Sequence, residues 1–212
     1  MAGDTEFFHY ADSYATVPVD GHKENWQVRS KGFRGWLLNQ FYRATGKAPS
    51  AQAVADALGI LEARGRFDGE ELKTFIRVAQ SEGSIYIDLC DKDWRAVEIT
   101  SGGWRVIDNS PVKFIRSKGM LSLPVPIAGG SIDELKPFLN IEAKEWPLVV
   151  GFLVASLKST GPYPILVLQG EQGNAKSTFA RILRSLVDPS TAPLRTIPRE
   201  ERDLLISAKN GW

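Results

Sequence analysis

The stretch that most constrains the fold is residues 163–178, which reads YPILVLQGEQGNAKST. Its apolar run at residues 165–168 is typical of a strand buried on both faces, and Gly170 ends that run. A helical pattern then begins at Lys176. The order is strand, glycine-containing turn and helix start, in the frame of the phosphate-binding loop G-x-x-x-x-G-K-[ST].

This frame predicts a nucleotide site. A polyanionic phosphate needs backbone N–H donors, the positive end of a helix dipole and one mobile cation. Lys176 can reach the β and γ phosphates of ATP, and the hydroxyl of Ser177 can hold Mg²⁺. We therefore predict that the cofactors ATP and Mg²⁺ bind at Gly170, Glu171, Gln172, Gly173, Asn174, Ala175, Lys176, Ser177 and Thr178.

Ala175 departs from the motif, which has glycine at this position. Its methyl group narrows the approach of a phosphate but need not abolish binding, because the residue lies where the helix begins. The alternative is a strand–turn–helix connection whose glycines serve only the turn. The next helix favours the motif, since apolar residues recur at helical spacing and should face a sheet: Phe179, Ile182, Leu183, Leu186 and Val187.

Composition excludes several classes of protein. The 212 residues carry a net charge of +1, so the chain is not a polycation built for nucleic acid. Cys90 is the single cysteine and cannot form an internal disulfide. The longest apolar segment, residues 148–157, is shorter than the roughly 20 residues that cross a bilayer and is expected to be a buried helix. We expect a cytoplasmic protein with no membrane partner.

The first part of the chain predicts a hairpin followed by two helices. Strands around residues 14–19 and 26–29 are joined by a turn at residues 20–23, with Asp20-Gly21 as the turn signal. Residues 31–45 have a helical period that ends at Gly46, and Ser50 can cap a second helix. Two amphipathic helices with a short connection form a helical hairpin.

An antiparallel meander should follow. Its five segments are rich in β-branched and aromatic residues and are separated by turn signals: residues 74–78, 84–90, 94–100, 104–108 and 112–116. The fold class is thus an α+β domain at residues 1–122, a Pro/Gly-rich linker at 123–130, and an incomplete α/β P-loop core at 131–212. A capping box at Ser131 and Glu134 should begin that core.

Basic and aromatic residues alternate between Lys23 and Lys47, where Glu24 is the one acid. Such a mixture could follow a nucleic-acid backbone and stack its bases. Alternatively the aromatics at helical spacing are core and the basic residues are a solvated helix face. The residues concerned are Arg29, Lys31, Arg34, Arg43, Trp26, Phe33, Trp36, Phe41 and Tyr42. His9 and His22 are isolated, so no protein-ligated metal centre is predicted.

Beyond the loop we expect a short strand at residues 193–197 and a helix from Pro198. ATP hydrolysis needs an acidic residue at the end of a second buried strand to complete the Mg²⁺ shell. No apolar strand that ends in aspartate or glutamate follows Lys176. The catalytic residues are therefore unknown, and we expect a fragment that binds nucleotide but needs a downstream segment for hydrolysis.

With GEQGNAKST followed by DPSTAPLR and PREERDLLISAKNGW, the chain resembles phage- and prophage-type bacterial P-loop ATPases related to primase-helicase proteins. The resemblance extends upstream through WxVRSKGFRGWL, DWRAVEIT and GSIDELKPFLN, so it covers nearly the whole chain. It implies an alanine before the motif lysine and an acidic Walker B segment after Trp212. It also implies a core like those of superfamily 3 helicases and AAA+ ATPases.

Such ATPases work as homo-oligomeric rings in which one subunit supplies an arginine to its neighbour; Arg195, Arg199 and Arg202 are candidates by position alone. The leading hypothesis is an ATP-binding fragment of a DNA-dependent, helicase-like ATPase from a phage or mobile element. One alternative is a P-loop kinase of small molecules or nucleosides. Another is a non-catalytic module that binds nucleotide together with DNA or a partner.

Overall fold

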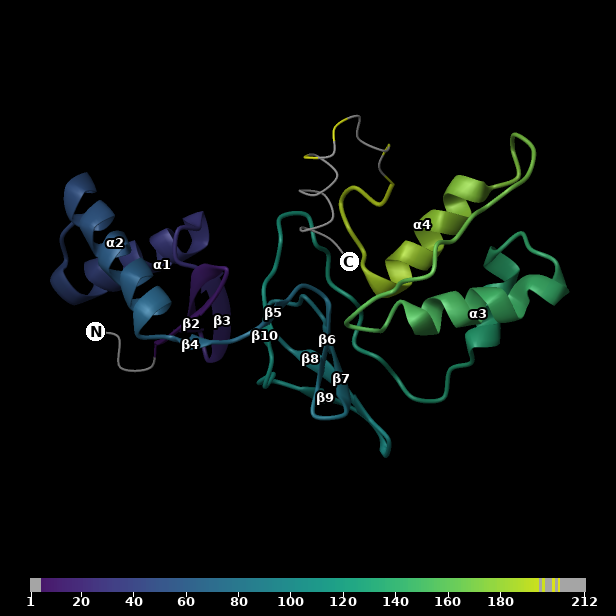
Figure 1. Cartoon of the computed structure of the whole chain (residues 1–212), viewed down its shortest axis with the longest axis horizontal. Helices are drawn as coiled ribbons and strands as arrows, with labels where there is room; N and C mark the ends of the chain where they lie inside the picture. The colour runs from purple at the N-terminus through teal and green to yellow at the C-terminus, as the bar shows by residue number, and fades with distance from the viewer. Residues whose placement is uncertain (1–4, 195, 197–199, 201, 203–212) are drawn as a thin grey trace. The chain divides into compact units, whose positions relative to one another are not determined.

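The computed structural model describes residues 5–194, 196, 200 and 202, which form a mixed α+β structure (Figure 1). The chain divides into two compact units. The first consists of Met1–Phe75 and Pro111–Ile115, and the second of Ile76–Ser110 and Arg116–Trp212. This division groups the meander with the C-terminal part, whereas the boundaries predicted from sequence lie at residues 123–130.

The first unit contains a four-stranded sheet in the order β3-β2-β1-β4. Its strands are β1 (Glu6–Tyr10), β2 (Asp12–Val19), β3 (His22–Gln27) and β4 (Glu70–Glu71). The predicted hairpin is confirmed, since β2 pairs antiparallel with β3 and Val19 faces His22 across the Asp20-Gly21 turn. Strand β1 was not predicted from the sequence; it pairs antiparallel with β2 and is separated from it by one residue, Ala11.

The predicted helical hairpin is also confirmed, as α1 (Lys31–Thr45) and α2 (Ala51–Phe67). The side chain of Ser30 caps α1, Gly46 adopts a left-handed conformation after it, and Ser50 caps α2. Both helices contact the sheet. The core between them consists of Ala15, Val17, Val28, Phe33, Val54 and Leu58.

Two short strands, β5 (Thr74–Phe75) and β10 (Lys113–Phe114), form a separate parallel pair in the first unit. Their assignment to the meander was wrong. The apolar pattern from Thr74 to Val78 reads as one strand, but β5 ends at Phe75 and the meander begins at Val78. Local periodicity cannot reveal this break because it depends on a partner far along the chain.

The meander itself is confirmed in the second unit as four antiparallel strands in sequence order. These are β6 (Val78–Ser81), β7 (Ser84–Asp88), β8 (Ala96–Thr100) and β9 (Gly103–Ile107). The turn between β6 and β7 has positive φ at both Glu82 and Gly83, which matches the twist of a tight hairpin.

The C-terminal part contains two 3₁₀ helices, η1 (Ile132–Phe138) and η2 (Ala143–Glu145), followed by α3 (Trp146–Ala155) and α4 (Lys176–Val187). The capping box of Ser131 and Glu134 is confirmed, although the helix that it begins is 3₁₀ rather than α. The prediction that residues 148–157 form a helix buried on all sides was wrong. Val149 and Leu153 are buried, but Leu148 and Val154 on the other face are exposed.

The predicted strand at residues 165–168 is not formed among the described residues. Leu166 and Leu168 pack against the α3–α4 core, whereas Ile165 and Val167 are 89% and 68% exposed. The expectation of burial on both faces was therefore wrong, because no described strand pairs with this segment. A P-loop α/β core is not present in the described residues. The segment predicted as strand 193–197 and the helix from Pro198 fall largely outside them.

None of the helices in the described ranges is long and apolar enough to span a bilayer.

Glycines at positions 69 and 59 should respond in opposite ways to a methyl group. A Cβ at Gly69 would lie 2.4 Å from the carbonyl oxygen of Gly65 and 2.8 Å from that of Phe7, so Gly69→Ala should destabilise the protein by about 1–3 kcal/mol. At Gly59, within α2, a Cβ meets nothing within 4 Å, and Gly59→Ala should stabilise it by about 0.5–1 kcal/mol. Urea unfolding of the wild type and both variants measures these changes in the free energy of unfolding. Equal urea midpoints for the two variants would contradict the prediction.

Candidate nucleotide-binding loop

The candidate loop, residues 170–178, turns the chain into α4 through three positive φ angles. Gly170 has φ of 149°, Gly173 of 92° and Ala175 of 55°. The first two values favour glycine. Ala175 adopts the left-handed helical conformation with a side chain, which costs about 1–2 kcal/mol. The position where the motif has glycine therefore has the backbone conformation for which glycine is suited.

The N-terminus of α4 has backbone donors that no side chain caps. The first helical hydrogen bond runs from the amide of Phe179 to the carbonyl of Ala175, at 2.9 Å. The amides of Lys176, Ser177 and Thr178 precede that bond and have no acceptor within the helix. Loop residues 170–175 are exposed. A solvent-accessible group of amides therefore lies at the positive end of the helix dipole.

Lys176 folds back over the loop. Its ammonium donates to the carbonyl oxygens of Gly170 and Glu171, both at 2.7 Å. The cation therefore lies against the turn that leads to the uncapped amides. A lysine side chain has a flexible four-carbon stem, so the ammonium can exchange these carbonyls for a stronger anionic acceptor.

The apolar face of α4 holds the helix against α3. Phe179 and Leu183 are buried, and Ile182 and Val187 pack beside them. Leu186 is the exception and is about half exposed. The apolar face of α4 is thus confirmed, but the prediction that it packs on a sheet was wrong, because its partner is the core shared with α3. The core that receives this face consists of Leu139, Val149, Leu153, Phe179 and Leu183.

The C-terminal end of α4 is held by a buried ion pair that was not predicted from the sequence. Asp188, 2% exposed, accepts from Nε of Arg77 at 3.1 Å and from Nη2 of Arg184 at 2.8 Å. Arg77 is fully buried just before β6. Its other two donors reach the carbonyls of Asp88 and Leu121, each at 2.9 Å. Each of the three guanidinium nitrogens therefore has an acceptor.

The chain beside this ion pair adds backbone bonds. The amide of Leu121 donates to the carbonyl of Pro189, and that of Thr191 donates to the carbonyl of Gly119, each at 2.9 Å. Met120 and Ser190 form an antiparallel bridge between these bonds. The meander, the segment after it and the end of α4 are therefore one hydrogen-bonded assembly within the second unit.

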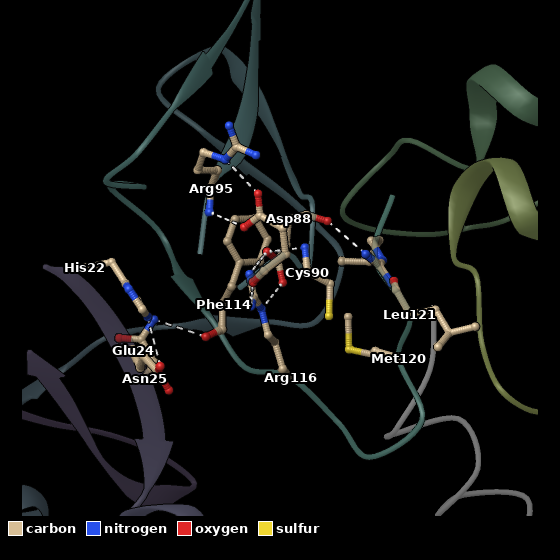
Figure 2. A network of polar contacts seen from close by, with 12 residues as sticks. His22, Glu24, Asn25, Asp88, Cys90, Arg95, Phe114, Arg116, Met120 and Leu121 are labelled. Carbon is tan, nitrogen blue, oxygen red and sulfur yellow. Dashed lines mark hydrogen bonds and ion pairs between the residues drawn. The ribbon is translucent and has the colours of Figure 1, made fainter. Parts of the chain in front are cut away.

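A second carboxylate extends this assembly (Figure 2). Asp88 is buried and accepts from Nε and Nη2 of Arg116, at 3.0 and 2.7 Å. It also accepts from the amide of Cys90. Burial raises the pKa of the Cys90 thiol, which makes it a poor nucleophile, and no catalytic role was predicted for it. The guanidinium of Arg116 also lies 4.0 Å above the ring of Trp94.

Among residues 5–194, 196, 200 and 202, no group of three or more His, Cys, Asp or Glu side chains could hold a metal ion. Arg195 and Arg199, two candidates for an arginine supplied to a neighbouring subunit, lie outside the described residues, and Arg202 is exposed.

Removing the buried guanidinium should be costly. Arg77→Met leaves the carbonyls of Asp88 and Leu121 and one oxygen of Asp188 without their donor, and we expect a loss of about 3–5 kcal/mol in the free energy of unfolding. Arg105→Met is the control, because Arg105 pairs with Glu98 at the surface and should matter far less. Chemical denaturation compares the two; similar losses would refute the structural role of Arg77.

Asp91 should make stability depend on pH. Burial alone raises the pKa of its carboxyl, but hydrogen bonds from the amide and guanidinium of Arg95 outweigh burial and hold the pKa below its ordinary value. The stabilisation is complete above the unfolded pKa of about 3.9 and is lost as the pH falls through the lower folded value. Unfolding between about pH 5 and 2 should therefore depend less steeply on pH in Asp91→Asn. An unchanged slope would contradict this.

Comparison with known proteins places the loop in a family context. Residues 132–212 match the family model of the actinomycete integrative conjugative element replication protein. The matched range begins at η1 and includes both the candidate loop and α4. No curated protein and no solved structure gives a significant match. The C-terminal part of the chain, from η1 onward, therefore matches a replication protein of a mobile genetic element.

Proposed function

We propose that this chain is the nucleotide-binding part of a DNA-dependent, helicase-like ATPase that replicates a mobile element, and that ATP and Mg²⁺ bind at residues 170–178. The observation that carries the proposal is the start of α4, where three amides without an intrahelical acceptor, two glycines with positive φ and the Lys176 ammonium meet. The family match of the same range to a replication protein supports the biological setting.

Each residue of the loop has a role in this proposal. The amides of residues 176–178 donate to phosphate oxygens at the positive end of the α4 dipole. Lys176 leaves the carbonyls of Gly170 and Glu171 and neutralises the charge of the terminal phosphates. The Ser177 hydroxyl binds Mg²⁺, and the glycines leave room for the phosphate to approach the backbone. ATP hydrolysis would supply the free energy for work on DNA, with copies of the protein assembled in a ring.

The proposal predicts that Lys176 is needed for nucleotide affinity. Lys176→Met should weaken binding of Mg²⁺-ATP by about tenfold or more, because the charge-assisted contact to the phosphates is lost. Lys158→Met is the matched control, since Lys158 is an exposed lysine beyond the end of α3. Isothermal titration of the three proteins gives the affinities.

Two results of that titration would refute the nucleotide site. One is the absence of ATP binding by the wild-type protein, and the other is equal affinity in Lys176→Met. Ser177→Ala adds a second test, because it should reduce the gain in ATP affinity that Mg²⁺ provides while leaving metal-free binding nearly unchanged. A kinase of small molecules would instead transfer phosphate to a nucleoside acceptor, which a radiolabelled transfer assay detects.

A further inference from the structure

The helical hairpin of the first unit is strongly basic, although the whole chain is nearly neutral. Residues 31–67 contain six basic and two acidic residues, whereas the chain has a net charge of +1. Both acids already have partners. Glu62 accepts from Nε of Arg29 at 2.8 Å, and Asp56 accepts from the side-chain Nε2 of Gln52 at 2.7 Å. The positive charge of the hairpin is therefore concentrated and has little internal compensation.

Helix α1 carries three of these six basic residues on its outer face. Lys31, Arg34 and Arg43 are exposed and form no ion pair among the described residues, and Lys47 follows just after the helix. Phe33, on the opposite face, is fully buried in the core. Tyr42 lies eleven residues, or about three turns, after Lys31, so it shares the line of that lysine, and it is 62% exposed. Lys31 and Tyr42 lie near the middle of the outer face, and Arg34 and Arg43, nine residues or about 180° apart around the helix, lie at its two opposite edges. The exposed half of α1 is thus cationic with an accessible aromatic ring.

Other residues of the basic and aromatic region have partners or pack in the core, unlike the three exposed cations of α1. Arg29 is paired with Glu62, and Phe33 stacks on Trp36, whose indole N–H donates to the carbonyl of Pro18. Core packing therefore explains these two aromatics. Lys31, Arg34 and Arg43 have no such structural explanation.

Two of these cations lie in the first turn of α1, where positive charge destabilises a helix. This turn contains Lys31 and Arg34 and no acidic residue. The positive end of a helix dipole favours acidic side chains and disfavours cations. A sequence that keeps two cations there departs from the local preference, and such departures concentrate at functional sites.

We propose that the outer face of α1, formed by Lys31, Arg34, Tyr42 and Arg43, binds the phosphodiester backbone of DNA. The cations span about 18 Å along the helix axis, which is roughly the length of five nucleotide steps. Arginine and lysine contact phosphates without reading sequence, so this surface holds and orients DNA rather than selecting a base order. The inference rests on the proposed function in that the partner is DNA.

The test compares two triple variants: one lacks three positive charges of α1, and the control lacks three positive charges of the second unit. The first variant combines Lys31→Gln, Arg34→Gln and Arg43→Gln, in which glutamine keeps a helix propensity close to that of the native residues. The control combines Lys118→Gln, Lys158→Gln and Arg181→Gln, which are exposed positions of the second unit without ion pairs among the described residues. Circular dichroism and thermal unfolding establish that both variants keep the wild-type fold.

Binding is measured by fluorescence anisotropy with a labelled 20-nucleotide single strand and its duplex, without ATP, at several salt concentrations. The wild type should bind the single strand or the duplex. The affinity of the α1 variant for the same oligonucleotide should be lower by roughly tenfold or more. The slope of log K against log salt should fall in magnitude by about 2.7 for a duplex or about 2.1 for a single strand. The control variant should keep the wild-type slope.

Two outcomes would overturn the proposal. One is no binding of either oligonucleotide by the wild type at low salt. The other is an equal or larger loss in the control variant, which would indicate a general charge effect or a surface in the second unit. Because ATP is omitted, failure of the nucleotide site would leave these results unchanged, and failure of the α1 face would leave ATP titrations unchanged.

Discussion

The second unit depends on the burial of one guanidinium, that of Arg77. Removing this charge from water is very unfavourable unless every donor finds an acceptor. The protein supplies one carboxylate and two main-chain carbonyls, which come from the end of α4, the end of β7 and the segment after the meander. These three parts of the chain must therefore assemble together, because the absence of any one leaves a buried donor unsatisfied.

This constraint gives α4 its position. One end of the helix is fixed by Asp188, and its apolar side is fixed by the core shared with α3. The other end, at Lys176, is left with exposed amides and no capping side chain. A helix held in this way offers its N-terminus as a pre-oriented group of donors, so a phosphate bound there would not have to order the helix first.

Features with local signals were predictable from the sequence. Asp20-Gly21 indicated its hairpin, Gly46 the end of α1 and Ser50 the start of α2, because caps and tight turns depend on neighbouring residues. The start of α4 at Lys176 was predicted in the same way. Arg77 was missed because its acceptors lie 11, 44 and 111 residues away. The prediction of a strand at residues 165–168 was wrong. Burial of both faces of a strand depends on neighbouring strands, and a local sequence pattern does not show whether those strands are present.

The parallel pair of β5 and β10 makes the first unit discontinuous in sequence. Between these strands the chain forms the whole meander of the other unit. Lys113 of β10 then bonds to Glu6 and Thr16 in the N-terminal sheet, at 2.6 and 3.0 Å. During synthesis on the ribosome, the first unit must therefore wait for its last strand, β10, until the meander has already emerged. No single cut of the chain releases this unit intact, so recombination could exchange it only as a piece that carries the meander with it.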